Sequence, residues 1–152
     1  MNTKITLNSR NIHSNLIEER IASTGISMPD AVYLFGGTSA PTTSNVMRKH
    51  SSHTWNVGPV IPGSGIQYGC GVRISSTELV LIGGSDSLKA VRKYNTKTDQ
   101  WTDMPNLKKG RQMHNCAMVN KKIIVSGGND GEKTLMDTEI IPLSTENPRQ
   151  ES

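Results

Sequence analysis

The chain has 152 residues, which suits a single domain, and carries 17 Lys and Arg against 13 Asp and Glu, for a net charge of +4. Apolar residues make up 34% and aromatic residues 4% of the sequence, so the core is sparse and few rings are present for stacking nucleic-acid bases. No apolar run reaches the length of a signal peptide or a membrane span, so we expect a cytoplasmic protein with no membrane partner, with secretion as the alternative if an N-terminal part is missing. The scarcity of aromatic rings leads us to expect no nucleic-acid partner.

The N-terminal segment, residues 1–27, is poorly patterned. Ile12, Leu16, Ile17 and Ile21 share one face if the chain is helical there, so a short helix over residues 12–21 is an alternative to an irregular segment. At the other end, residues 144–152 form a polar tail. The patterned part of the sequence is therefore residues 28–143.

Three short apolar stretches in this part each end in a pair of glycines. The pairs are Gly36-Gly37, Gly83-Gly84 and Gly127-Gly128, and their first members are 47 and 44 residues apart. Recurrence at such a period indicates a structural repeat. The stretches are rich in β-branched residues and bounded by turn formers, as buried strands are, and no segment shows sustained helical periodicity. The sequence predicts an all-β fold with antiparallel strands.

Further residues recur in register with the glycine pairs. Trp55 lies 18 residues after Gly37, and Trp101 lies 17 residues after Gly84, each behind a polar turn. Tyr94 precedes the second of these turns, whereas the third copy has no Trp near Thr145. The predicted repeats cover residues 28–58, 66–105 and 111–143, and we expect the last to lack its final strand.

These residues resemble the kelch repeat, in which an apolar strand ending in Gly-Gly is followed by a Tyr strand, a polar turn and a Trp strand. The resemblance implies four-stranded blades arranged around a central channel, here two blades and most of a third. Propellers close with four to eight blades. We therefore expect a partial propeller, which is a fragment of a longer kelch protein, a chain that self-associates to complete the ring, or an open arc.

The two cysteines, Cys70 and Cys116, each belong to the strand before a Gly-Gly strand. The resemblance places that strand innermost, along the channel. Equivalent positions one blade apart rarely meet the geometry of a disulfide, so we expect two buried free thiols.

No cofactor, metal or catalytic site is predicted. The glycine-rich segment from Gly63 to Gly71 leads into a strand, whereas a dinucleotide-binding loop leads into a helix. The four histidines lie without nearby ligand partners in the sequence, and no nucleophile motif is present. Because the kelch family includes sugar-active enzymes, the alternative is part of a carbohydrate-active propeller, mutarotase- or oxidase-like.

The resemblance instead favours a non-enzymatic scaffold that binds a protein or peptide through blade loops, as a substrate adaptor or a cytoskeleton-binding module does. Two sets of loops are candidates: those after the glycine pairs (38–45, 85–87 and 129–133) and those leading to the next blade (59–65 and 105–111). The predicted partner-binding residues are Tyr68, Lys108, Lys109, Arg111 and His114. For Arg111 and His114 an equal alternative is that they brace one blade against the next.

Overall fold

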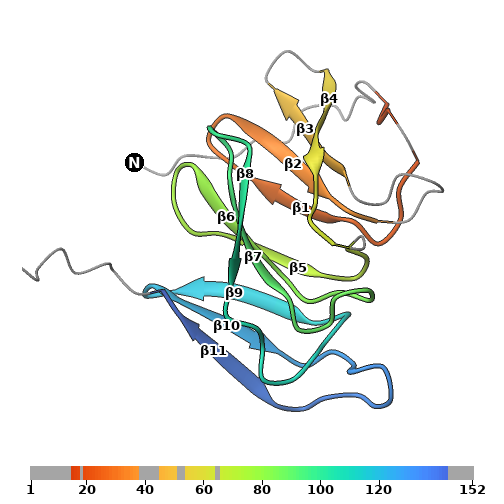
Figure 1. The fold of residues 1–152 in the computed structure, drawn as a ribbon, viewed down its shortest axis with the longest axis vertical. Coiled ribbons are helices and arrows are strands. Elements are labelled where there is room, and N and C mark those ends of the chain that lie inside the picture. Colours follow the sequence, from red (N-terminus) through yellow and green to blue (C-terminus); the bar gives the residue numbers. More distant parts are fainter. Residues whose placement is uncertain (1–14, 18, 38–44, 51–53, 64–65, 144–152) are drawn as a thin grey trace, which may run out of the picture.

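The computed structural model describes residues 15–17, 19–37, 54–63 and 66–143, together with the backbone of 45–50. Three antiparallel sheets lie one after another, with the first at the top of Figure 1 and the third at the bottom. Blade 1 contains β1 (Thr24–Ser27), β2 (Ala31–Phe35), β3 (Asn45–His50) and β4 (Trp55–Val60). Blade 2 contains β5 (Cys70–Arg73), β6 (Glu78–Ile82), β7 (Val91–Asn95) and β8 (Gln100–Met104). Blade 3 contains β9 (Asn115–Val119), β10 (Lys122–Ser126) and β11 (Thr138–Pro142).

The predicted all-β, antiparallel partial propeller is confirmed: two sheets have four strands, and the third has three among the described residues. The first blade starts earlier than the boundary predicted at residue 28, because β1 pairs with β2 over Thr24 to Ser27. Residues 15–17 and 19–21 of the segment considered for a helix are not helical. Residues 12–14, 18 and the polar tail 144–152 lie outside the described residues.

Blades 1 and 2 are joined by an aromatic core. Tyr33 and Phe35 of β2 pack against Tyr94 and Trp101 of blade 2, so four of the six aromatic residues of the chain meet at this junction. The Tyr94 and Trp101 ring centroids are 4.6 Å apart, and Leu79 and Leu81 complete the cluster. Concentrating large rings at one junction offsets the low aromatic content of the chain.

Blades 2 and 3 are joined by an aliphatic core. Val80 and Ile82 project from β6 towards Ile123 and Val125 of β10, and all four side chains are fully buried. Leu79 and Leu81, which alternate with these β6 residues, face blade 1. Because strand side chains alternate between faces, the continuous apolar run of β6 buries itself against both neighbours.

The first glycine of the first two pairs lies where the linker to the next blade crosses it. Gly36 and Gly83 have φ values of 62° and 59°, and a Cβ on either would overlap the backbone carbonyl of Ile66 or Arg111, respectively. The second glycine binds the same carbonyl, with Gly37 N–H 2.7 Å from Ile66 O and Gly84 N–H 3.0 Å from Arg111 O. Glycine is required by both conformation and space.

The expectation of free thiols was wrong, because Cys70 and Cys116 form a disulfide with Cα atoms 6.0 Å apart. The two positions are not equivalent. Cys70 lies opposite Ile82, the residue before a glycine pair, whereas Cys116 lies opposite Val125, two residues before one. An offset of one residue reverses the face of a strand side chain. Cys70 therefore points towards blade 3 and Cys116 towards blade 2, from innermost strands that are in contact.

Replacing both cysteines with serine should lower the free energy of unfolding by about 2 to 4 kcal/mol, because the bond spans 46 residues of chain and restricts the unfolded state. Urea unfolding measures the change. A reducing agent should produce the same loss in the native chain and none in the double variant. Two free thiols by mass spectrometry after oxidative refolding would contradict the bond.

Gly83→Ala should destabilise the chain by about 3 kcal/mol, through the left-handed backbone and the overlap with the next linker. Gly131→Ala is the matched control, since Gly131 also has a positive φ of 102° but its nearest atom, Leu88 Cδ1, is 3.9 Å from the added Cβ. We expect about 1 kcal/mol there. Equal losses in urea unfolding would show that the linker does not press on Gly83.

Candidate functional site

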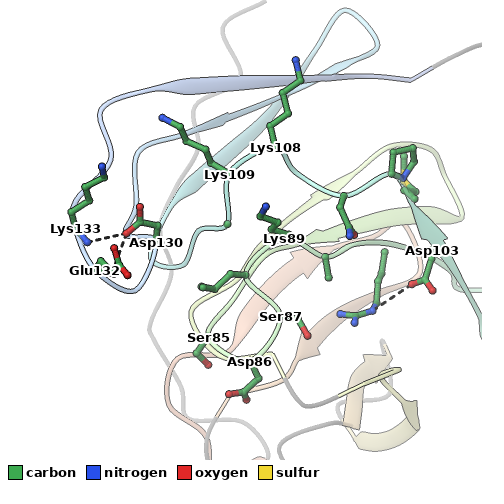
Figure 2. Close-up of a pocket in the computed structure, with 17 residues that line it drawn as sticks. Ser85, Asp86, Ser87, Lys89, Asp103, Lys108, Lys109, Asp130, Glu132 and Lys133 are labelled. Carbon is green, nitrogen blue, oxygen red and sulfur yellow. Dashed lines mark hydrogen bonds and ion pairs between the residues drawn. The ribbon is translucent and has the colours of Figure 1, made fainter.

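Candidate loops from both sets lie on the same side of the sheets, and those of blades 2 and 3 (85–87, 105–111 and 129–133) contribute residues to one groove. This follows from the antiparallel order within a blade, because the second and fourth strands run in the same direction and therefore end on the same side of the sheet. The groove has a volume of about 1150 Å³ and lies between blades 2 and 3 (Figure 2). It is lined by residues 85–90, Arg92, residues 103–106, residues 108–110, Asp130, Glu132 and Lys133. Candidate loop 38–44 and residues 64–65 lie outside the described residues.

Several charges of the groove are engaged within the chain. Arg92 Nε lies 3.6 Å from Asp103 Oδ1. Asp130 Oδ1 accepts hydrogen bonds from the backbone N–H of Lys133 and Glu132, at 2.9 and 3.0 Å, and these bonds hold the pKa of Asp130 below its usual range. The ammonium group of Lys89, at the centre of Figure 2, forms no ion pair with any described residue.

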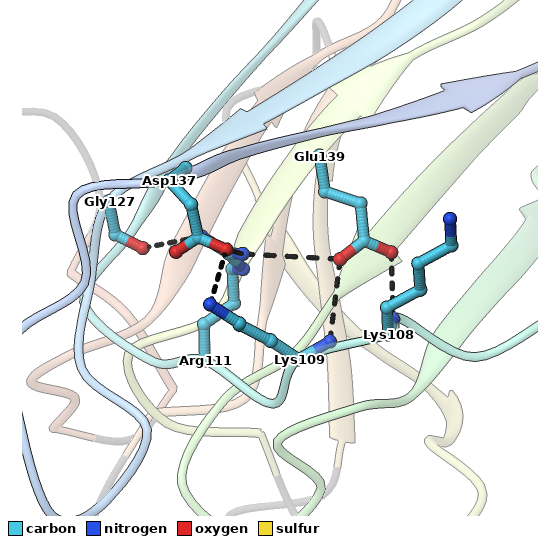
Figure 3. A network of polar contacts seen from close by, with 6 residues as sticks. All are labelled: Lys108, Lys109, Arg111, Gly127, Asp137 and Glu139. Carbon is cyan, nitrogen blue, oxygen red and sulfur yellow. Dashed lines mark hydrogen bonds and ion pairs between the residues drawn. The ribbon is translucent and has the colours of Figure 1, made fainter.

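The wall formed by residues 105–110 is fixed to blade 3 by two acidic residues (Figure 3). Glu139 accepts hydrogen bonds from the backbone N–H of Lys108 at 2.8 Å and of Lys109 at 3.4 Å. Lys109 Nζ lies 3.1 Å from Asp137 Oδ2, and this contact holds the pKa of Asp137 below its usual range. Lys109 is thus engaged in the wall, while the side chain of Lys108 stays exposed and pairs with no described residue.

Arg111 is fully buried, which contradicts its predicted contact with a partner. Its guanidinium donates to the carbonyl oxygens of Gly127 at 2.8 Å and Asp137 at 3.3 Å in blade 3, while its own carbonyl accepts from Gly84 in blade 2. Arg111 therefore braces the two blades, as the structural alternative held. Charged guanidinium donors satisfy the carbonyls where the chain leaves the strand.

Sequence reasoning missed the equivalent arginine of blade 1. Arg20 Nη1 donates to Gly36 O, just as Arg111 Nη1 donates to Gly127 O. The signal was available, because each arginine lies 16 residues before the glycine that it contacts.

His114 is also buried, between the glycines of two blades. An added Cβ on Gly83 would lie 2.8 Å from His114 Cε1, and one on Gly128 would lie 2.8 Å from His114 Cβ. Burial, followed by the nearby charge of Arg111, lowers the pKa of His114 to about 4. The ring is neutral at pH 7 and, like Arg111, lies too deep to contact a partner.

Tyr68 lies two residues before the innermost strand β5, and 37% of it is exposed. It has a left-handed backbone with φ 57°, as do Ala22 and Met113 at the equivalent positions of blades 1 and 3. Hydrogen bonds join the three, from Tyr68 N–H to Ala22 O at 3.0 Å and from Met113 N–H to Tyr68 O at 2.8 Å. Tyr68 is accessible but does not line the groove.

The described residues contain neither a metal-binding cluster nor a membrane-spanning helix. No three side chains of His, Cys, Asp or Glu gather there in a group that would hold a metal ion. The same residues include no helix with the length and apolar character needed to cross a membrane.

The native chain should lose more stability in acid than a His114→Gln variant. The folded-state pKa of about 4 lies below the unfolded value of 6.5, so the unfolded state binds a proton first as the pH falls. Stability from this group is complete above pH 6.5 and decreases as the pH approaches 4. Between pH 7 and 4.5 we expect an excess loss of about 2 kcal/mol in urea unfolding. Parallel pH profiles of the two proteins would contradict this.

Comparison with known families agrees with the strand pattern. Residues 68–108 match the family model described as Kelch motif, a range that runs from Tyr68 ahead of β5 to Lys108 after β8. No curated protein matches the chain. The second blade therefore matches the kelch motif, in agreement with its glycine pair, Tyr94 and Trp101, and the flanking sheets repeat its order of strands.

Proposed function

We propose that this chain is a non-enzymatic protein-interaction scaffold that binds an extended peptide segment of its partner in the groove between blades 2 and 3. The observation that supports this most directly is the convergence of both loop sets on one open groove of about 1150 Å³. Ligand pockets for small molecules are typically about 300 to 1000 Å³ and largely apolar. A wider groove lined mainly by polar and charged loops suits a peptide better.

The charges favour a partner segment with carboxylate side chains. Asp103 and Asp130 are engaged by Arg92 and by backbone amides, whereas the exposed ammonium groups of Lys89 and Lys108 pair with no described residue. These lysines are available to a carboxylate, and the net charge of +4 adds long-range attraction.

Buried residues would support this function indirectly. Arg111 links both sides of the groove through its contacts with Gly84 and Gly127, and Glu139 fixes the backbone of Lys108. A wall that is already ordered loses less conformational entropy on binding. We propose the general role of an adaptor or cytoskeleton-binding module on the strength of the kelch repeat.

Selection of random 12-residue peptides displayed on phage against the chain tests the proposal. We expect enriched sequences to carry an excess of Asp and Glu. Their affinity for a Lys89→Glu, Lys108→Glu variant should fall at least tenfold, because two unpaired cations of the groove become anions. Lys97→Glu is the control with a similar charge change, in the exposed β7–β8 turn at the opposite end of the strands, and should bind as the native chain does. Peptides that bind the double variant and the native chain equally would refute the groove as the site.

A further inference from the structure

We propose that two copies of this chain close into a six-bladed ring, in which the outer face of blade 3 of one copy packs on the outer face of blade 1 of the other. This interface is separate from the groove and does not depend on the peptide-binding proposal.

Both junctions join the same two kinds of sheet face. We call the face turned to the following blade the trailing face and the face turned to the preceding blade the leading face. On blade 2, Leu79 and Leu81 belong to the leading face and Val80 and Ile82 to the trailing face. The leading face of blade 1 and the trailing face of blade 3 contact no blade.

The leading face of blade 1 has the apolar character of its buried counterpart on blade 2. Counting back from the glycine pairs, Val32 and Leu34 correspond to Leu79 and Leu81. Trp55 corresponds to Trp101 in its strand pairing, and Val57 lies on the same face. The blade 2 counterparts of Val32, Leu34 and Trp55 are buried or packed in the core, whereas 43% of Val32 is exposed. Val57 corresponds to Asp103, which is itself exposed, so Val57 lies at the margin of this face.

The trailing face of blade 3 carries a matching apolar row. Ala117 of β9, Ile124 of β10 and Ile140 of β11 lie directly opposite one another across the three strands. Ile124 corresponds to Val80, which is fully buried at the junction of blades 2 and 3, yet 55% of the neighbouring Ile140 is exposed. Gly127 on this side also has room, since its nearest atom is Leu135 O at 3.8 Å from an added Cβ.

Backbone groups at the two ends continue the same pattern. At each internal junction the N–H of the later blade donates to the carbonyl of the earlier one, from Tyr68 to Ala22 and from Met113 to Tyr68. The next bond in the series would use the Met113 carbonyl and the N–H of Ala22 in a second copy. Neither group is hydrogen-bonded to a described residue.

The contacts of the innermost strands support the same interface. At Gly71 an added Cβ would contact Thr24 and Ile26 of the preceding blade, whereas at the equivalent Gly25 only Leu34 of its own blade lies within 4 Å. In the ring, β9 of the second copy occupies this side of Gly25.

The number of copies follows from closure. A contact between two different faces produces a ring when its rotation closes and a filament when it does not. Propellers typically contain four to eight blades, so two copies fit this range with six blades and three copies exceed it with nine.

Light scattering coupled to size exclusion tests the interface on the full 152-residue chain. The native chain should have about twice the mass of one 16.6 kDa copy. Val32→Asp on blade 1, at the position equivalent to the fully buried Leu79, and Ile140→Asp on blade 3 should each halve the mass, because either charge disrupts both interfaces of the ring. Thr98→Asp, in an exposed turn of blade 2, should leave the mass unchanged. Circular dichroism establishes that each variant is folded.

A mixture of the two monomeric variants decides whether the interface joins different faces. Ile140→Asp keeps an intact blade 1 face and Val32→Asp keeps an intact blade 3 face, so the mixture should recover a species of twice the monomer mass through one sound interface. A folded native monomer, a filament, a dimer that survives either variant, or a mixture that stays monomeric would each overturn the proposal. The last result would indicate a contact between like faces or through the edge of β11.

Discussion

The close approach of neighbouring blades at their innermost strands governs the rest of this structure. At the first junction Gly71 faces Thr24, and a side chain there would overlap the preceding blade. The equivalent residues at the second junction are Cys116 and Cys70, which are close enough to be bonded. The same approach brings each linker carbonyl onto the amide of a paired glycine. The glycine pairs, the disulfide and the strand contacts thus all result from the short distance between the innermost strands of neighbouring blades.

Sequence reasoning succeeded where a residue is required by its own backbone or by burial. The glycine pairs, Tyr94 and Trp101 fixed the repeat, because their conformation or size allows few substitutes. It failed for the cysteines, because it treated Cys70 and Cys116 as equivalent positions. Their strand partners lie one and two residues before a glycine pair, respectively, and this difference of one residue turns the two side chains towards each other. It also missed β1, whose sequence Thr-Gly-Ile-Ser has a single buried apolar residue and no alternation long enough to detect.

The cations of the candidate site differ in burial and in pairing, and residue type alone does not reveal these differences. Arg111 and the lysines before it are all cations on one linker, yet Arg111 is fully buried, Lys109 is held by Asp137 and Lys108 remains exposed. Which cation is engaged depends on the positions of Asp137 and Glu139, about thirty residues further along the chain and brought close by the pairing of β10 with β11. The convergence of the two loop sets, by contrast, follows from antiparallel order and was open to inference from the strand pattern.

The left-handed residues Ala22, Tyr68 and Met113 show that the junctions impose conformation as well as select residues. A positive φ on a residue other than glycine costs of order 1 kcal/mol or more, and it persists only where surrounding contacts demand it. Here the demand comes from the hydrogen bonds that run from each blade to the one before, since the turn at each of these residues directs its amide or carbonyl to the neighbour. Tyr68 makes these hydrogen bonds to both neighbouring blades, whereas Ala22 and Met113 each make one and adopt the same backbone. One junction is therefore enough to hold the conformation, and each terminal blade already has the shape that a further junction would need.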